Sequence, residues 1–233
     1  MDAEAPKRKT RGPNVAGERA RDALIDQATA LFAKHGYSGI STREITKEAN
    51  INQASIHYYF GTKRELFLAA VAKHFNHISL QRYAMLDAAC ADGPPTLEAV
   101  LRALIAPHVR FVTHRNGKDY LRIYATFGST PDDIIEEIYA KHFNELRSRF
   151  LEAIAAAVPD LPREDLHRAF SFITNMLVTA LFDPGYKVMT GRKPHIVDVE
   201  NFIELMVTYN AAGVRAIAAE AHRQAPAQAG SSA

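Results

Sequence analysis

Apolar residues recur at helical spacing along the whole chain, and this periodicity limits the possible folds more than any other feature. We find no run in which apolar and polar residues alternate strictly, as a half-buried strand requires. In the first periodic segment Leu24, Ala28, Leu31 and Phe32 share one helical face, and Gly36 follows as a stop signal. The sequence therefore predicts an all-α protein.

Capping residues set the limits of the first helices. Ser41 and Glu44 form a capping box, Asn52 is placed to cap the next helix, and Thr62 with Glu65 repeats the capping box. Glycine, proline and asparagine residues separate these segments from one another. We expect the N-terminal helices at about residues 17–35, 41–49, 53–60 and from 62 onward.

Proline-containing breaks divide the rest of the chain, the clearest being Gly93-Pro94-Pro95. The longest helix expected there has Thr130 as its cap, Pro131 as its first residue and two aspartates in its first turn. The expected helices are about residues 96–114, 119–127, 131–158, 162–182 and 197–222.

The turn at residues 50–52 joins two short helices, which is the plan of a helix-turn-helix. On its second helix Ile56 and Phe60 form an apolar side. The opposite side carries Gln53, Ala54, His57 and Tyr58. This side has no acidic residue that phosphates would repel, and Gln, His and Tyr can bond to bases or phosphates. The geometry therefore favours DNA binding, although any small helical protein can contain such a trio of helices.

Positive charge is concentrated at the N-terminal end of the chain. Residues 1–65 carry a net charge of +3, whereas the remainder carries −1, and four basic residues lie within Lys7–Arg11. We expect residues 1–16 to form a flexible basic arm and residues 224–233 a disordered tail. A basic arm suits a polyanion because each neutralised phosphate releases a counterion; the alternative is a solvated tail.

Several functional classes are excluded by what the sequence lacks. Cys90 has no partner for a disulfide, and a thiolate metal site needs several cysteines. His74 and His77 lie three residues apart, but no carboxylate at suitable spacing completes a metal site. There is no phosphate-binding glycine loop, no nucleophile motif and no apolar run long enough to cross a bilayer. We expect a cytoplasmic protein without a cofactor or metal that is neither an enzyme nor bound to a membrane.

The N-terminal motif has a recognisable order. It consists of Gly36-Tyr37, Ser41-Thr42, Glu44-Ile45, Ala49, Ile51 and Ser55-Ile56-His57-Tyr58-Tyr59-Phe60, followed by Lys63 and Leu66-Phe67. Over about residues 18–70 this pattern resembles the DNA-binding domain of TetR/AcrR-type transcriptional regulators. The resemblance implies a homodimer that represses transcription at a palindromic operator until a small molecule binds the C-terminal domain. The expected DNA contacts are Thr42, Arg43, Gln53, Ala54, Ser55, His57, Tyr58 and Lys63.

The C-terminal helices are apolar on more than one face. In the helix at 162–182 one stripe contains Leu166, Phe170 and Ile173, and a second contains Phe172 and Met176. A helix of this kind must be covered twice, by its own core and by a further surface. We expect a four-helix dimer interface, the alternative being an internal helix pair of a monomer. Its expected residues are Phe170, Ile173, Leu177, Phe202, Met206, Asn210 and Gly213.

The effector site is the least determined part of the sequence. Pro107 interrupts the helix at 96–114 and should kink it, which can open space between helices. The expected effector-binding residues are His108, Phe111, Arg122, Tyr124, Phe127 and Phe143, with Tyr120, Tyr139 and His142 as further candidates. Aromatic walls with few polar groups suit a small, largely apolar ligand.

Four segments follow from these observations: the arm at 1–16, a helix-turn-helix domain at 17–68, an effector-binding and dimerisation domain at 69–223, and the tail. The leading hypothesis is a ligand-responsive, dimeric DNA-binding regulator. The alternative is a helical small-molecule-binding protein or enzyme that retains a helix-turn-helix without using it.

Overall fold

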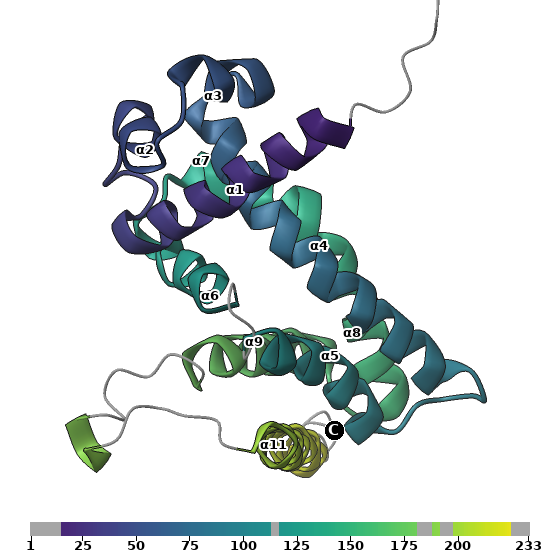
Figure 1. Ribbon diagram of the computed structural model, residues 1–233. Coiled ribbons are helices and arrows are strands. Elements are labelled where there is room, and N and C mark those ends of the chain that lie inside the picture. Colours follow the sequence, from purple (N-terminus) through teal and green to yellow (C-terminus); the bar gives the residue numbers. More distant parts are fainter. Residues whose placement is uncertain (1–14, 113–116, 181–187, 192–197, 225–233) are drawn as a thin grey trace, which may run out of the picture.

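The computed structural model describes residues 15–112, 117–180, 188–191 and 198–224, and within these residues it contains helices and no strand (Figure 1). The all-α prediction is therefore confirmed. Residues 1–14 of the expected basic arm and 225–233 of the expected tail lie outside the described residues, whereas Val15 and Ala16 begin α1 and Gln224 ends α11. The helices are α1 (Val15–His35), α2 (Thr42–Glu48), α3 (Gln53–Phe60), α4 (Lys63–Cys90), α5 (Leu97–Val112), α6 (Gly117–Ala125), α7 (Asp132–Ile138), α8 (Asn144–Ala157), α9 (Arg163–Ala180) and α11 (Val199–Gln224).

Capping fixes the first three helices as the sequence predicts. The Ser41 hydroxyl accepts from the Glu44 backbone N–H (3.2 Å), and the Glu44 carboxylate accepts from the Ser41 N–H (2.8 Å). Gly36 ends α1 with a φ of 73°, in the left-handed region that glycine adopts without strain. The second capping box forms only by half: Thr62 caps α4, but its own N–H donates to Phe60 O (2.8 Å).

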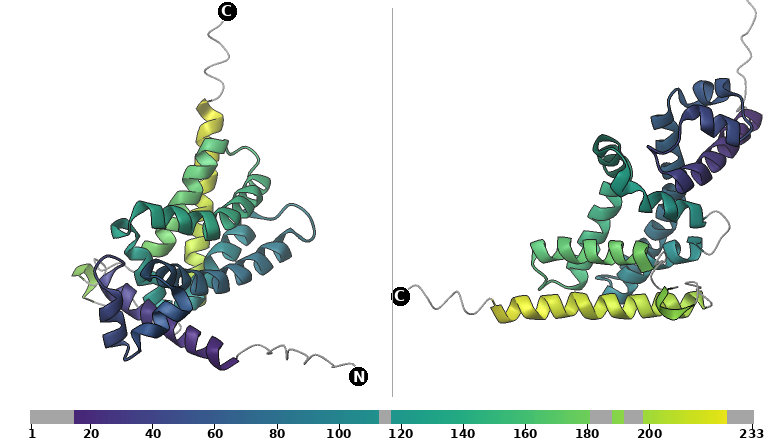
Figure 2. Two further views of the ribbon diagram at one scale, coloured as in Figure 1. Left: turned by 90° about the horizontal axis from the view of Figure 1, so that it is seen from above. Right: turned by 90° about the vertical axis from the view of Figure 1, so that its left-hand side faces the viewer.

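Helix α4 connects the N-terminal helices to the rest of the molecule. It runs without interruption from Lys63 to Cys90, so the expected domain boundary at residue 68 falls inside a helix. Figure 1 shows α1–α3 gathered at one end of α4, with α5, α8, α9 and α11 toward its other end. In the side view of Figure 2, α11 lies along the base of the molecule, away from α1–α3.

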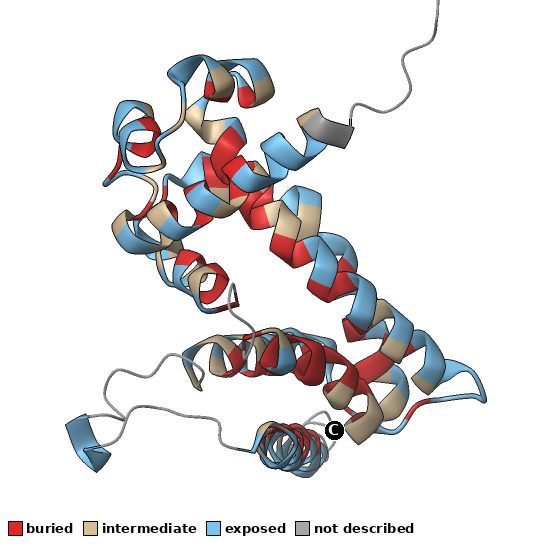
Figure 3. Cartoon of the chain, viewed as in Figure 1, coloured by how far each residue is buried: buried red, intermediate tan, exposed pale blue. Residues whose placement is uncertain are grey.

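Two clusters of buried apolar side chains stabilise the fold. Figure 3 marks the buried residues in red along the helices. The larger one joins α4, α5, α8, α9 and α11. The smaller one contains the cores of α1–α3 and the start of α4, and it also includes Ile123 of α6 with Ile134 and Ile138 of α7. Because these three isoleucines come from the C-terminal half of the sequence, the N-terminal helices do not have a core of their own. We call this smaller cluster the shared core.

The long helix expected at residues 131–158 is wrong in two details. It is divided into α7 and α8 by a π-helical segment, η2 (Tyr139–Phe143). There the Phe143 ring packs 4.3 Å from the Phe75 ring and 5.6 Å from the Tyr124 ring. These contacts are tertiary, so helical periodicity alone does not reveal the π turn. Thr130 is not a cap, because its buried hydroxyl donates to Thr126 O (3.0 Å).

A cavity in the shared core should destabilise the whole chain. Ile123→Ala removes a fully buried side chain from α6 and should lower the free energy of unfolding by about 2–5 kcal/mol. Leu80→Ala, at a position that is 69% exposed, is the control and should change it by less than about 0.5 kcal/mol. Urea unfolding followed by circular dichroism measures both. Equal effects of the two variants would contradict the burial of Ile123.

Candidate nucleic-acid interface and effector region

Helix α3 exposes the face that the sequence predicts. Ile56 and Phe60 are buried, whereas Gln53, Ala54, His57 and Tyr58 are exposed. Tyr58 retains 82% of its accessible surface, which is exceptional for a large ring in a folded chain. The cap at Asn52 fixes the start of α3, because its side-chain oxygen accepts from the Ala54 N–H (2.9 Å). The buried face of α3 and its capped N-terminus therefore fix the orientation of the exposed face.

Three neighbouring segments complete this surface. The side chains of Gln53, Ala54 and His57 line one hollow together with Thr42 from the first turn of α2 and with Thr62 and Lys63 from the start of α4. Arg43, Lys47 and Asn52 line a second hollow. Ser55 is half-buried and Arg43 is exposed. Six of the eight expected DNA contacts thus line these two hollows, whereas Ser55 and Tyr58 line neither. Exposed Lys47 is a further cation at the second hollow that the sequence pattern did not indicate.

His57 has a defined hydrogen bond. Its Nδ1 lies 2.7 Å from Gly61 O, and because a carbonyl only accepts, Nδ1 carries the proton. In the neutral ring Nε2 is then an acceptor. An acceptor at this position suits the exocyclic amino group of adenine or cytosine in the major groove, whereas a protonated ring suits a phosphate.

Lys63 is placed beside an aromatic ring. Its Nζ lies 4.4 Å from the centre of the Tyr37 ring, and the Tyr37 ring packs against Phe67 (5.1 Å). Partial burial lowers the pKa of Lys63, and the charge of Glu44 opposes this shift. The cation–π contact with Tyr37 and the position of Lys63 as the first residue of α4 place its ammonium group at the edge of the first hollow.

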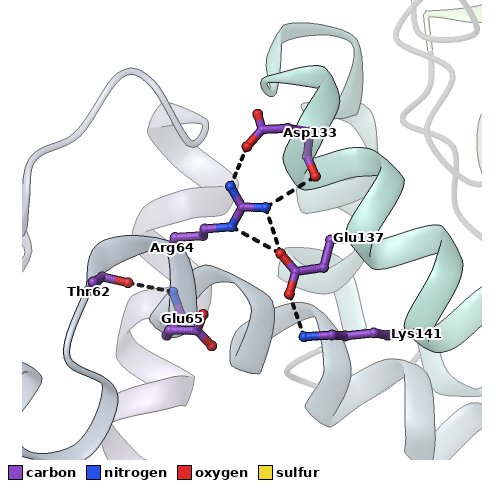
Figure 4. Close-up of polar contacts among 6 residues, drawn as sticks. All are labelled: Thr62, Arg64, Glu65, Asp133, Glu137 and Lys141. Carbon is purple, nitrogen blue, oxygen red and sulfur yellow. Dashed lines mark hydrogen bonds and ion pairs between the residues drawn. The ribbon is translucent and has the colours of Figure 1, made fainter.

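A network of ion pairs connects the start of α4 to α7 (Figure 4). The Arg64 guanidinium donates through Nε to the Glu137 carboxylate (3.0 Å) and through Nη2 to Asp133 O (3.2 Å), and it also pairs with the Asp133 carboxylate. Glu137 pairs in turn with Lys141. Hydrogen bonds from Lys141 and then Arg64 lower the pKa of Glu137, so the carboxylate is charged at neutral pH. Arg64, which directly follows Lys63, thus connects the start of α4 to the C-terminal half of the molecule.

Five of the six expected effector residues belong to one chain of ring contacts. The Tyr124 ring lies 6.5 Å from His108, 4.8 Å from Phe127 and 5.6 Å from Phe143. Phe111 joins through Tyr120 (5.7 Å). Arg122 does not join these rings, because its exposed side chain pairs with Asp119 (2.9 Å) on the surface of α6.

The sequence analysis missed one buried cation beside these rings. Arg82 of α4 retains only 6% of its accessible surface and donates to Leu104 O (2.8 Å) and to His108 Nδ1 (3.3 Å). Its spacing from Phe75, Ile78 and Leu86 places it on the apolar stripe of α4. The signal in the sequence that could have identified Arg82 is the presence of a charged residue on an apolar helical stripe.

The expected dimer residues lie mostly inside one protomer. Phe170, Ile173, Leu177, Met206 and Asn210 are buried in the larger cluster or beside it, so they stabilise the protomer itself. Phe202 is half-buried and Gly213 is exposed. The large apolar side chains that α9 and α11 expose are Phe172 (62%), Leu205 (64%) and Tyr209 (65%). These three side chains occupy the faces of α9 and α11 that their protomer leaves uncovered.

Membrane-spanning helices and metal-binding clusters are both absent from the described residues. Among them, no helix is both long and apolar enough to span a membrane. In the same part of the chain, histidine, cysteine, aspartate and glutamate side chains form no group of three or more that could hold a metal ion.

Two domain families match this chain, one in each half. The family described as "Bacterial regulatory proteins, tetR family" matches residues 24–70, and "Tetracyclin repressor-like, C-terminal domain" matches residues 102–213. Together they cover most of the chain, and the N-terminal match contains all the expected DNA contacts.

Characterised relatives are similar over about half of the chain. The biofilm operon icaADBC HTH-type negative transcriptional regulator IcaR of Staphylococcus aureus (strain Newman) is 26% identical over 121 residues, which are 52% of this chain and 60% of that protein. IcaR of Staphylococcus epidermidis is 28% identical over 55% of this chain and 63% of its own length. The match therefore spans less than two thirds of these relatives.

Among solved structures, a TetR-family transcriptional regulator from Bordetella parapertussis superposes with a TM-score of 0.63. The two chains are 18% identical, and the superposition covers 83% of this chain and 94% of the other. This likeness concerns the fold.

Removing the cap of α3 should destabilise the helix that carries the exposed face. Asn52→Ala leaves the Ala54 N–H without its side-chain acceptor and should lower the free energy of unfolding by about 0.5–2 kcal/mol. Asn52→Ser keeps a capping oxygen and should stay within a few tenths of a kcal/mol of the parent. Urea titrations of the three proteins give the comparison, and an equal loss in both variants would argue against the cap.

Proposed function

The chain belongs to the TetR family of transcriptional regulators, and from this premise we propose that it is a homodimeric repressor that binds a palindromic operator and releases it when a small, largely apolar effector binds. The observation that carries the proposal is the exposed, acid-free face of α3. Each protomer supplies one such helix, so a dimer places two of them in successive major grooves about 34–36 Å apart. The name of the staphylococcal relatives, negative transcriptional regulators, supports repression.

The roles of the DNA contacts follow from their chemistry. Gln53 and His57 are suited to base edges, because both present hydrogen-bonding groups on the exposed face of α3. Ala54 and Ser55 allow the backbone to approach the groove closely. Tyr58, Thr42, Arg43 and Lys63 are suited to phosphates on the two sides of the groove. Phosphate contacts supply affinity, and the two base contacts supply sequence preference.

Dimerisation is assigned to the faces of α9 and α11 that the protomer leaves uncovered. Phe172, Leu205 and Tyr209 expose large apolar surfaces, and Phe202 and Gly213 on α11 remain accessible to a partner. Burying such side chains against a second copy removes apolar area from water, which is a main driving force for association. We retain the helix pair that the sequence indicated as the dimer interface, but we assign its contacts to the exposed side chains instead of the buried ones.

Effector control is assigned to the contacts between α6, α7 and the N-terminal helices. Tyr124 and Ile123 are adjacent on α6, and Ile123 lies in the shared core while Tyr124 contacts the effector-region rings. Arg64 adds a polar connection to Asp133 and Glu137. A ligand that binds better to a conformation with displaced α6 would reposition α3, because only a difference in affinity between conformations can release DNA.

Replacing single contacts should separate affinity from sequence preference. Lys63→Ala should weaken binding to all sequences and reduce the salt dependence by about one counterion, a slope change of about 0.9. Gln53→Ala should reduce discrimination between operator and mutated operator by about 1–3 kcal/mol. Fluorescence anisotropy with labelled DNA that flanks the protein's own gene, titrated with salt and competitor DNA, measures both quantities.

The matched control is Arg147→Ala, which removes an exposed cation from α8 and should leave DNA binding unchanged. Competitor DNA could abolish binding, and Lys63→Ala and Arg147→Ala could weaken it equally. Together these results would indicate non-specific electrostatic attraction only. Absence of binding to any flanking DNA at low salt would contradict the proposal and favour a helical binding protein that does not use its helix-turn-helix.

A charge on the uncovered face should prevent dimerisation. Leu205→Glu would bury an unpaired carboxylate in the dimer and should raise the dimer dissociation constant by about tenfold or more. Leu80→Glu changes a similarly exposed leucine on α4 and should leave the dimer intact. Sedimentation velocity over a concentration series distinguishes the two. A parent protein that remains monomeric, or a dimer insensitive to Leu205→Glu, would contradict the assigned interface.

A further inference from the structure

A buried positive charge lies between α4 and α5 without a negative partner. Arg82 forms no ion pair with any carboxylate in the described part of the chain, and the titratable groups that interact with it are Tyr83, Tyr120, Tyr124 and His108. Burial lowers the pKa of Arg82, but a guanidinium stays protonated in proteins. A buried charge is ordinarily paired, so this one lacks the partner that its surroundings require.

The contacts that Arg82 does make need no charge. Its Nε donates to Leu104 O, which lies in the turn of α5 that Pro107 weakens because proline has no N–H. A neutral amide could satisfy this carbonyl equally well. The Nη1 group has no hydrogen-bond partner among the described residues, so at least two of the five guanidinium N–H donors are available to another group.

His108 presents a second unused donor at the same place. Arginine only donates, so His108 Nδ1 accepts from Arg82 Nη2 and the ring proton lies on Nε2. Burial first, and then the charge of Arg82, holds the pKa of His108 well below its usual value, so the ring is neutral. The Nε2 atom is buried and has no partner. A buried N–H without an acceptor is rare in folded proteins, so Nε2 is available to donate to a bound group.

Two tyrosines of α6 add a third donor. The Tyr120 hydroxyl donates to the Tyr124 hydroxyl (3.0 Å), and the Tyr124 proton then has no acceptor in the described residues. Burial raises the pKa of both tyrosines, so both remain O–H donors. Their rings lie 6.2 Å and 6.5 Å from His108, so the tyrosines, His108 and Arg82 form one cluster. We call Arg82, His108, Tyr120 and Tyr124 the buried donor cluster.

We propose that the buried donor cluster binds the carboxylate of a monoanionic ligand whose remaining body is apolar. The cluster offers one positive charge and several donors but no negatively charged acceptor, which is the complement of a single carboxylate. One charge with neutral histidine matches a monoanion better than a doubly charged phosphate. Phe111, Phe127 and Phe143, which pack around Tyr120 and Tyr124, would contact the apolar body.

This inference rests on the proposed function for the consequence of binding, and deepens it by giving the ligand's chemistry. A carboxylate held by Arg82 on α4 and Tyr124 on α6 would connect two of the helices that contribute to the shared core. Tyr124 adjoins Ile123 on α6, so a ligand that moves the tyrosine moves a side chain packed against the N-terminal helices.

Isothermal titration calorimetry of the full-length protein without DNA tests the site itself. The probes are octanoate, decanoate and 4-phenylbutyrate, each compared with the primary alcohol of the same skeleton. At least one carboxylate should bind about tenfold or more tightly than its alcohol, because only the carboxylate pairs with Arg82. Equal affinities of every carboxylate and its alcohol would overturn the proposal.

Two variants identify the residue responsible. Arg82→Met keeps the length and apolar stem but removes the charge, and it should abolish the preference for carboxylate while leaving alcohol binding unchanged. Because Arg82 has no carboxylate partner in the described residues, its replacement leaves no uncompensated buried charge behind, so this variant should fold. Arg122→Met removes the exposed arginine of α6 and should retain the preference. A preference that survives Arg82→Met would contradict the assignment.

A separate measurement distinguishes this inference from the proposed function. Adding the bound carboxylate to the protein–DNA complex should lower fluorescence anisotropy in the parent and not in Arg82→Met. Carboxylate binding by calorimetry without any DNA complex would support the buried donor cluster while the regulatory function fails. DNA binding by a protein that shows no preference for carboxylates would support the regulatory function and overturn the buried donor cluster.

Discussion

The shared core is the constraint on which the rest of the structure depends. Ile123, Ile134 and Ile138 pack among side chains of α1–α4, so the helices that carry the exposed α3 face are completed by residues far along the chain. Burying three isoleucine side chains contributes several kcal/mol, which is a large part of the stability of an ordinary domain. The position of α3 is consequently defined relative to α6 and α7, and Arg64 reinforces this relation through Asp133 and Glu137.

This arrangement joins the two proposed sites by a short physical path. Arg82 lies in the C-terminal half of α4, whereas α3 precedes the start of α4. Helix α6 takes part in both regions, because Tyr124 packs beside His108 and Ile123 lies in the shared core. A closely packed interior transmits a small displacement because its side chains cannot compress. In the proposed regulator, the ligand's carboxylate and the DNA phosphates therefore act on one continuous set of packed helices.

Local chemistry explains how much could be predicted from the sequence. The capping box at Ser41, the Asn52 cap and the exposed face of α3 depend on residues a few positions apart, and the structure contains them as expected. The π-helical segment at Tyr139–Phe143 and the contacts of Thr130 depend on tertiary packing, which periodicity does not encode. The two apolar stripes of α9 were visible, but which one faces the protomer's own core was not. Arg82 was missed because its environment comes from α5 and α6.

The central claim is that the N-terminal helices and α6–α7 are one cooperative unit. Native-state hydrogen exchange in increasing urea, read by mass spectrometry, tests it directly because it gives an opening free energy for each segment. The account predicts that amides of α1, α6 and α7 exchange through one common opening with the same free energy and the same dependence on urea. Opening of α1–α3 at a distinctly lower free energy, while α6 and α7 stay protected, would contradict it.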